Sequence, residues 1–168
     1  MTNASAIALS LAFGGAATTY AAAPAPPGEL TLTDAERTAA FTAAGFHRAA
    51  GGWRACDDPD TASYVPGSID EARDLGGDGQ PEAVITEGST VCFGAAGVGY
   101  YLVSRQGDGT WKLIDSGQGV PEFLETEGAA GWPDLEVGGP GLCFPVLRWN
   151  GTHYAPNRFE YEGKICQP

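Results

Sequence analysis

The residues with the clearest chemical potential lie in one short acidic segment that is followed directly by an apolar run. Asp74, Asp78 and Glu82 place carboxylates at intervals of four residues, and Gln80 adds a backbone carbonyl oxygen between the last two. Calcium takes about six to eight oxygen ligands, which a short loop with regularly spaced acidic residues can supply. The segment therefore predicts a calcium site formed by Asp74, Asp78, Gln80 and Glu82, with calcium as the cofactor.

Residues 74–82 also resemble the calcium loop of FG-GAP or VCBS-type repeats, which has the pattern D-x-N-x-D-G-x-x-E/D before a strand. The resemblance implies calcium held between strands. Gly76 stands where that family has Asn or Asp, so one side-chain ligand is absent. Because only one such loop is present, no propeller is expected. The alternative interpretation is an acidic, glycine-rich turn that binds no metal.

Two further stretches suggest contact surfaces or catalysis. Trp132 and Asp134 lie in a region rich in glycine and proline, and a tryptophan on such a loop can anchor a partner, which makes both residues candidates for partner binding. The acidic runs 57–60 and 122–127 could supply the two carboxylates of a glycoside hydrolase. Neither His47 nor His153 lies near a recognisable nucleophile motif, so catalysis is the less favoured alternative.

The amino-terminal residues 1–23 carry no charge and pass from an apolar stretch to small residues before Pro24. This pattern is typical of a secretory signal peptide, and the alanine- and proline-rich residues 24–30 suit a linker. A single domain is predicted for residues 31–168, in a periplasmic or secreted protein.

Four cysteines follow the predicted signal peptide. An even number of cysteines in an exported chain indicates disulfides. Three pairings are open, and the order along the chain favours Cys56 with Cys92 and Cys143 with Cys166. A structural zinc site is disfavoured because the chain has no C-x-x-C pair.

The charge balance restricts the partners. Nine Lys and Arg residues against 21 Asp and Glu give a net charge of -12, which repels nucleic acid and anionic lipid. The apolar run near the amino terminus is too short to span a bilayer. The predicted partner is therefore a protein or a glycan, with no nucleic acid and no membrane span.

The elements that must position these residues are mostly short strands. Thr33 to Glu36 has the pattern of a capping box, which predicts a helix ending at Gly45. Residues 83–86 predict a strand buried on both faces, and turns at 106–109 and 150–151 predict hairpins. One amino-terminal helix packed on a mainly antiparallel sheet of short hairpins makes the predicted fold class α+β.

The stretch from Leu32 to Gln167 resembles small exported bacterial proteins of uncharacterised function that combine such a loop with cysteine-bearing hairpins. The resemblance implies a fold and a compartment. The leading hypothesis is an exported, non-enzymatic binding module that is stabilised by calcium. The alternatives are an acidic inhibitor or immunity-like protein against a basic enzyme such as lysozyme, and a glycan-acting hydrolase.

Overall fold

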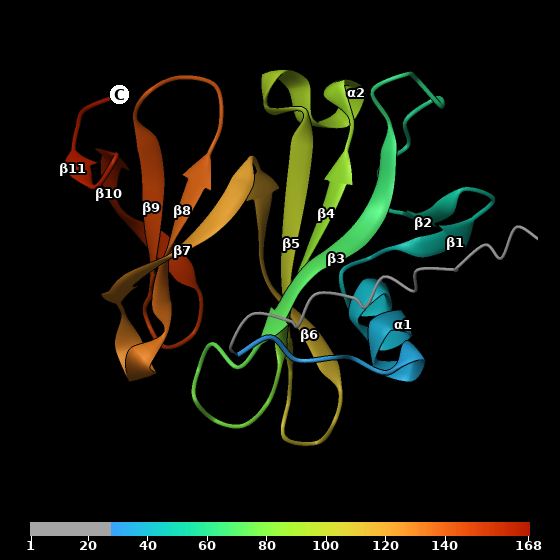
Figure 1. The fold of residues 1–168 in the computed structure, drawn as a ribbon, viewed down its shortest axis with the longest axis horizontal. Coiled ribbons are helices and arrows are strands. Elements are labelled where there is room, and N and C mark those ends of the chain that lie inside the picture. Colours follow the sequence, from blue (N-terminus) through green and yellow to red (C-terminus); the bar gives the residue numbers. More distant parts are fainter. Residues whose placement is uncertain (1–27) are drawn as a thin grey trace, which may run out of the picture.

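The computed structural model describes residues 28–168, which fold into two antiparallel β-sheets (Figure 1). Sheet one has the strand order β1-β2-β3-β4-β5-β6, and sheet two has the order β11-β10-β9-β8-β7. The strands of sheet one are β1 (His47–Ala49), β2 (Gly52–Arg54), β3 (Val65–Arg73), β4 (Glu82–Gly88), β5 (Val98–Arg105) and β6 (Trp111–Gln118). Those of sheet two are β7 (Val120–Glu127), β8 (Pro133–Gly138), β9 (Phe144–Trp149), β10 (Tyr154–Tyr161) and β11 (Lys164–Ile165). The predicted signal peptide, and the linker up to residue 27, lie outside the described residues.

The predicted α+β fold class is wrong, because the structure is mostly antiparallel β with eleven strands in two sheets. The helical elements are short: α1 (Asp34–Ala43), α2 (Thr90–Phe93), and the 3₁₀ turns η1 (Gly94–Ala96) and η2 (Ala129–Gly131). The sequence pattern missed strands whose composition is unusual for β-structure. β3 contains Pro66 and Gly67, and β7 contains four acidic or proline residues in eight positions. Their pairing with neighbouring strands outweighs weak local propensity.

The helix at the amino terminus begins as its sequence predicts. The Thr33 hydroxyl accepts a hydrogen bond from the Glu36 amide at 3.3 Å, and the Glu36 carboxylate accepts one from the Thr33 amide at 2.9 Å. This confirms the capping box. The helix buries Phe41, whose ring stacks on Trp53 of β2 at 4.6 Å between centroids. Helix α1 therefore covers one face of sheet one, where it packs on residues of β2, β3, β4 and β5.

The other face of sheet one packs against sheet two. The intersheet core contains buried residues from both sheets, namely Leu75, Val84, Tyr100, Leu102, Leu135, Val137, Trp149 and Tyr154. Strand β4 lies between β3 and β5, with Ala83 and Ile85 in the core beneath the helix and Val84 in the intersheet core. The prediction of a strand buried on both faces is thus confirmed.

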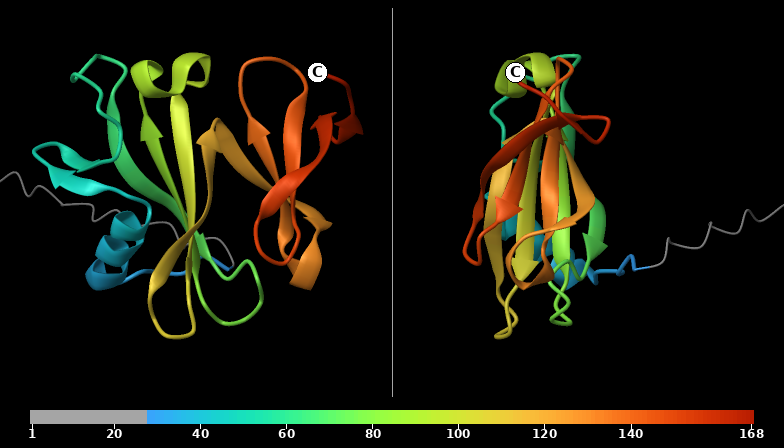
Figure 2. Two further views of the ribbon diagram at one scale, coloured as in Figure 1. Left: turned by 180° about the vertical axis from the view of Figure 1, so that it is seen from behind. Right: turned by 90° about the vertical axis from the view of Figure 1, so that its left-hand side faces the viewer.

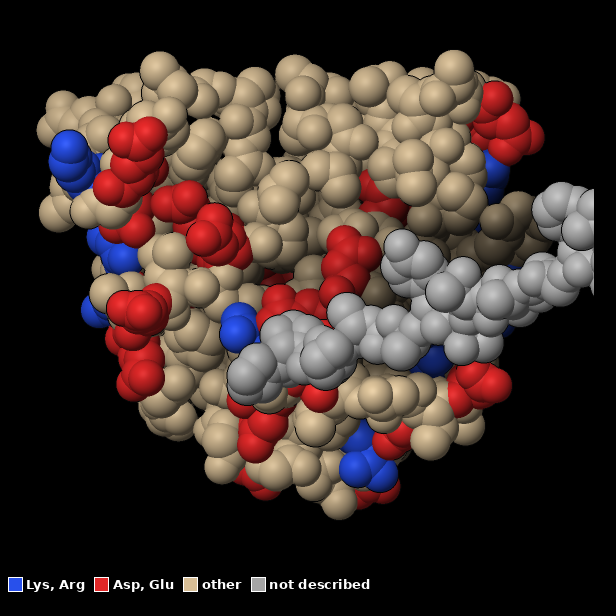
Figure 3. Space-filling model, in the orientation of Figure 1, with Lys and Arg blue, Asp and Glu red and all other residues tan. Residues whose placement is uncertain are grey.

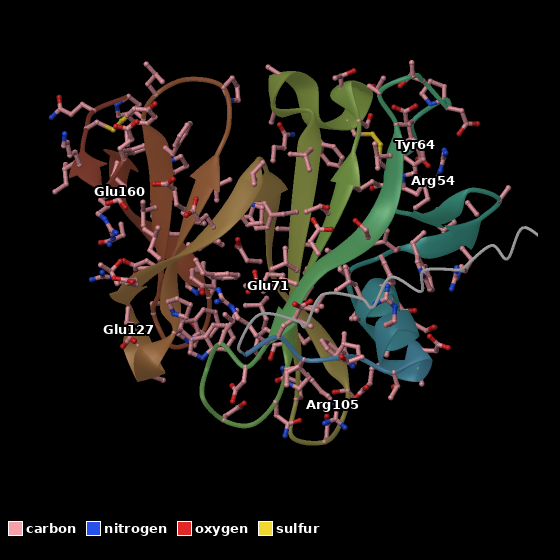
Figure 4. The ribbon with its side chains drawn as sticks, in the orientation of Figure 1. Arg54, Tyr64, Glu71, Arg105, Glu127 and Glu160 are labelled. Carbon is pink, nitrogen blue, oxygen red and sulfur yellow. A yellow bond between two sulfur atoms is a disulfide. The ribbon has the colours of Figure 1, made fainter. Side chains whose placement is uncertain are left out.

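The two ends of the sheets differ. The connections β3–β4, β5–β6 and β9–β10 all lie at the lower end in Figures 1 and 2. A hairpin forms at Asn150-Gly151, but its connection is the four residues 150–153, because Trp149 pairs with Tyr154; within it, Gly151 has a φ of 101°. Both disulfides lie at the opposite end (Figure 4).

The disulfides join Cys56 to Cys92 and Cys143 to Cys166, which is the pairing favoured by the order of the cysteines. They close loops with sequence separations of 36 and 23 residues. Two disulfides fit an oxidising environment, either extracellular or periplasmic. Within residues 28–168, no helix is long and apolar enough to cross a membrane.

Candidate functional site

The β3–β4 loop is ordered by its own carboxylates. The two Oδ atoms of Asp74 accept hydrogen bonds from the backbone amides of Asp78 at 3.1 Å and Gly79 at 2.9 Å. Asp78 in turn accepts one from the Gln80 amide at 2.8 Å. These bonds fix the turn of the loop, and they bring Asp74 and Asp78 together at the surface.

Glu82 points away from that loop surface. It is the first residue of β4 and shares the face of Val84, so its side chain enters the space between the sheets, where it is 2 % exposed. Its Oε2 accepts a hydrogen bond from the Leu75 amide and its Oε1 one from the Ser104 hydroxyl, both at 2.7 Å. Burial raises the pKa of the Glu82 carboxyl. Among the described residues, no three His, Cys, Asp or Glu side chains are grouped so as to hold a metal ion.

Trp132 packs directly on this loop. A Cβ atom added to Gly76 would lie 2.7 Å from Trp132 Nε1, which is closer than real Cβ atoms approach other atoms. The indole of Trp132 also stacks on that of Trp149, with centroids 4.6 Å apart. The structure therefore joins two regions that the sequence singled out separately, and it explains why glycine stands where the repeat family has a ligand residue.

Asp134 lies elsewhere. It alternates with Leu135, which is in the intersheet core, and so it faces the outer side of sheet two. Its fully buried carboxylate accepts hydrogen bonds from Arg148 at 2.7 and 2.8 Å, Arg158 at 2.6 Å and the Thr126 hydroxyl at 2.7 Å. Although burial opposes ionisation, these bonds hold the pKa of Asp134 well below its ordinary value. This arrangement links four strands of sheet two, β7, β8, β9 and β10.

The acidic runs considered for hydrolysis are also placed apart from one another. Asp58 is buried and accepts hydrogen bonds from Thr61 and Ser89, and Asp60 pairs with Arg54. They lie near the Cys56–Cys92 disulfide, whereas the second run lies on β7 of sheet two. The first run therefore serves to fix the long connection between β2 and β3.

A cleft opens where the three lower connections meet the Trp132–Trp149 pair. It has a volume of about 360 Å³. Its lining combines the two indoles with polar and charged groups, and the full set is Asp78, Ser104, Arg105, Gln106, Gly107, Lys112, Ile114, Trp132, Trp149, Gly151 and Thr152. We call this region the tryptophan cleft. Figure 4 shows Arg105 at that end of the molecule.

Most of these lining residues were not identified from the sequence. The turns at 106–109 and 150–151 were recognised as hairpin signals, and nothing local indicated that Gln106 and Thr152 lie at the same cleft. Trp149 directly precedes the second of these turns, in a stretch whose sequence predicts a strand. The sequence signal for such a cleft is limited to the polar residues Gln106 and Thr152, each at one of the two turns.

The fold and the site define a disulfide-bonded protein of two packed antiparallel sheets, with a tryptophan-lined cleft at the end opposite its disulfides. Comparison of the chain with protein-family models, with curated proteins and with solved structures gave no match.

Proposed function

We propose that this chain is an exported, non-enzymatic binding module that holds a glycan in the tryptophan cleft. The observation that carries the proposal is that the half-buried indole of Trp132, which stacks on the buried Trp149, lies at one cleft with hydrogen-bonding side chains from three separate connections. A sugar ring has apolar C–H faces and a rim of hydroxyl groups. The accessible part of the Trp132 indole suits a face, and groups such as Gln106 and Thr152 suit the rim.

The size of the cleft favours a glycan over a folded protein partner. Clefts that bind small ligands have volumes of about 300–1,000 Å³, whereas a protein interface needs about 800 Å² of surface on each partner. The lining includes a single carboxylate, from Asp78, while glycoside hydrolysis ordinarily uses a pair of carboxylates across the bond. Binding without hydrolysis is therefore the better fit to these side chains.

The test is calorimetric titration of the mature, oxidised protein with a panel of cello-, chito- and galacturonate oligosaccharides. We expect one member to bind, and Gln106→Ala to weaken that binding by about threefold to tenfold through the loss of a hydrogen bond. Gln118→Ala is the matched control, because Gln118 lies at the far end of β6 and is exposed. Absence of binding by every member of the panel would overturn the proposal.

Stabilisation of the β3–β4 loop by calcium is a second prediction, separate from glycan binding. A ligand that binds only the folded state raises stability by about 2.7 kcal/mol at a hundredfold excess over its dissociation constant. We expect the melting temperature to be higher in calcium than in chelator at matched ionic strength, with Asp78→Ala abolishing the difference. Equal melting temperatures in both conditions would show that the Asp74–Asp78 contacts form an acidic turn and no calcium site.

A further inference from the structure

The connection between β9 and β10 holds one side-chain amide in a network of hydrogen bonds. It comprises residues 150–153, all of them exposed. The Oδ1 atom of Asn150 accepts hydrogen bonds from the Thr152 amide at 3.0 Å, the Thr152 hydroxyl at 2.9 Å and the His153 amide at 3.1 Å. Donors aimed at a carbonyl oxygen stabilise the negative charge that forms there when a nucleophile attacks the carbon. The Cγ atom of Asn150 is therefore activated towards attack.

The amide nitrogen of Asn150 lies beside the imidazole ring of His153. Its Nδ2 atom is 3.1 Å from His153 Nε2 and 3.4 Å from His153 Nδ1. The Thr152 hydroxyl, which donates to Asn150 Oδ1, is also 3.0 Å from His153 Nδ1 and accepts its hydrogen. This leaves Nε2 to face the amide nitrogen, within the hydrogen-bond reach that a proton transfer requires.

The residue that follows Asn150 supplies a nucleophile. Gly151 has no Cβ atom to hinder the approach of its backbone nitrogen to the side chain of Asn150. Its φ of 101° lies in the left-handed region, which glycine adopts freely. Within residues 28–168, no acceptor takes the N–H of Gly151 in a hydrogen bond. A bond from this nitrogen to Asn150 Cγ closes a cyclic imide.

We infer that Asn150 is a site of self-modification, at which the folded connection promotes the conversion of this asparagine to isoaspartate and aspartate. The Gly151 nitrogen bonds to Asn150 Cγ and loses its proton to solvent. The Cγ–Nδ2 bond then breaks, and Nδ2 leaves as ammonia with a proton from the protonated His153 imidazole. Water adds to one carbonyl of the imide and opens the ring to a carboxylate. Overall, the reaction consumes one water, releases one ammonia and involves no oxidation.

The modification changes the rim of the tryptophan cleft, because Gly151 and Thr152 line that cleft. Isoaspartate routes the main chain through the former side chain, which lengthens the connection and displaces both residues. The new carboxylate also adds to the net charge of -12. Figure 3 shows one face of the protein, on which Asp and Glu are already widespread. The inference does not depend on which ligand the cleft binds.

The experiment follows the mature, oxidised protein during incubation near neutral pH, by peptide mapping with mass spectrometry and by enzymatic detection of isoaspartate. Asn157 is the internal control, because it is exposed in the bulge of β10 and is followed by Arg158. We expect Asn150 to convert about a hundredfold faster than Asn157. The reduced chain in concentrated urea keeps the Asn150-Gly151 sequence and loses the hydrogen bonds, so Asn150 should convert there about tenfold more slowly than in the folded protein.

Two pairs of variants assign the rate to the side chains of the connection. Thr152→Val should slow the conversion by about threefold to tenfold, and Thr152→Ser, which keeps the hydroxyl, should not. His153→Phe should slow it by at least about tenfold, whereas His47→Phe, which removes the exposed imidazole of β1, should leave it unchanged. Conversion that is no faster in the folded protein than in urea, or that neither Thr152→Val nor His153→Phe slows, would overturn the inference and leave glycan binding untouched.

Discussion

Asp134→Asn should lower the free energy of unfolding by about 3 kcal/mol, more than any single change in the tryptophan cleft. Removing one partner of a buried ion pair costs about 3–5 kcal/mol, because the other charge is left without compensation. The lower end applies here because the Arg148 side chain is 43 % exposed and water can solvate part of its charge, whereas Arg158 is 18 % exposed. Urea unfolding monitored by circular dichroism measures the loss.

The matched control for this variant is Glu122→Gln. Glu122 is an exposed carboxylate on β7 of the same sheet, opposite Glu136 on β8, so its removal should change stability by less than about 0.5 kcal/mol. Equal stability of Asp134→Asn and the unmodified protein would contradict the assignment of Asp134 to a structural network. It would restore Asp134 as a candidate for partner binding.

The stabilisation that Asp134 gives to the folded protein should depend on pH. The pKa of Asp134 is lower in the folded state than in the unfolded state, where it is about 3.9. The stabilisation by its ionised form is therefore fully present above pH of about 4 and is lost as the pH falls through the folded-state pKa. The difference in unfolding free energy between Asp134→Asn and the unmodified protein should shrink in that acidic range.

Gly76→Ala should destabilise the protein by about 1–3 kcal/mol, although the change adds a single methyl group. The backbone at Gly76 does not have a positive φ, so the cost comes from the contact of the new Cβ with Trp132. Displacing the indole costs free energy, because it stacks on Trp149. We also expect the fluorescence emission of the variant to shift to longer wavelength as Trp132 is displaced towards solvent.

Gly51→Ala is the control for this prediction. Gly51 also lacks a positive φ, and a Cβ there would meet nothing within 4 Å. Such a change usually stabilises a protein by about 0.4–1 kcal/mol through the entropy of the unfolded chain, so the two alanine variants should differ in sign. Gly76→Asp, which restores the ligand type of the repeat family, should show the same loss as Gly76→Ala. A Gly76→Ala variant with unchanged stability and emission would contradict the proposed packing.

Several features of this protein were determined by its sequence alone, and all of them depend on local contacts or on covalent chemistry. The capping box at Thr33 joins residues three apart, and Gly151, whose φ is 101°, marks the connection between β9 and β10. The run of apolar residues at 83–86 identified a strand covered on both faces. The order of the cysteines indicated the correct disulfide pairing because each pair closes a short segment of chain.

The tertiary structure decided the fold class and the character of the site. The sequence shows Asp74, Asp78 and Glu82 at equal intervals, but only the packing of sheet two against β4 turns Glu82 inward. Likewise, the arginines that neutralise Asp134 are 14 and 24 residues away along the chain, on other strands. A local pattern cannot specify such partners, because the strand period of two places a side chain on one of two faces and the fold determines what each face meets.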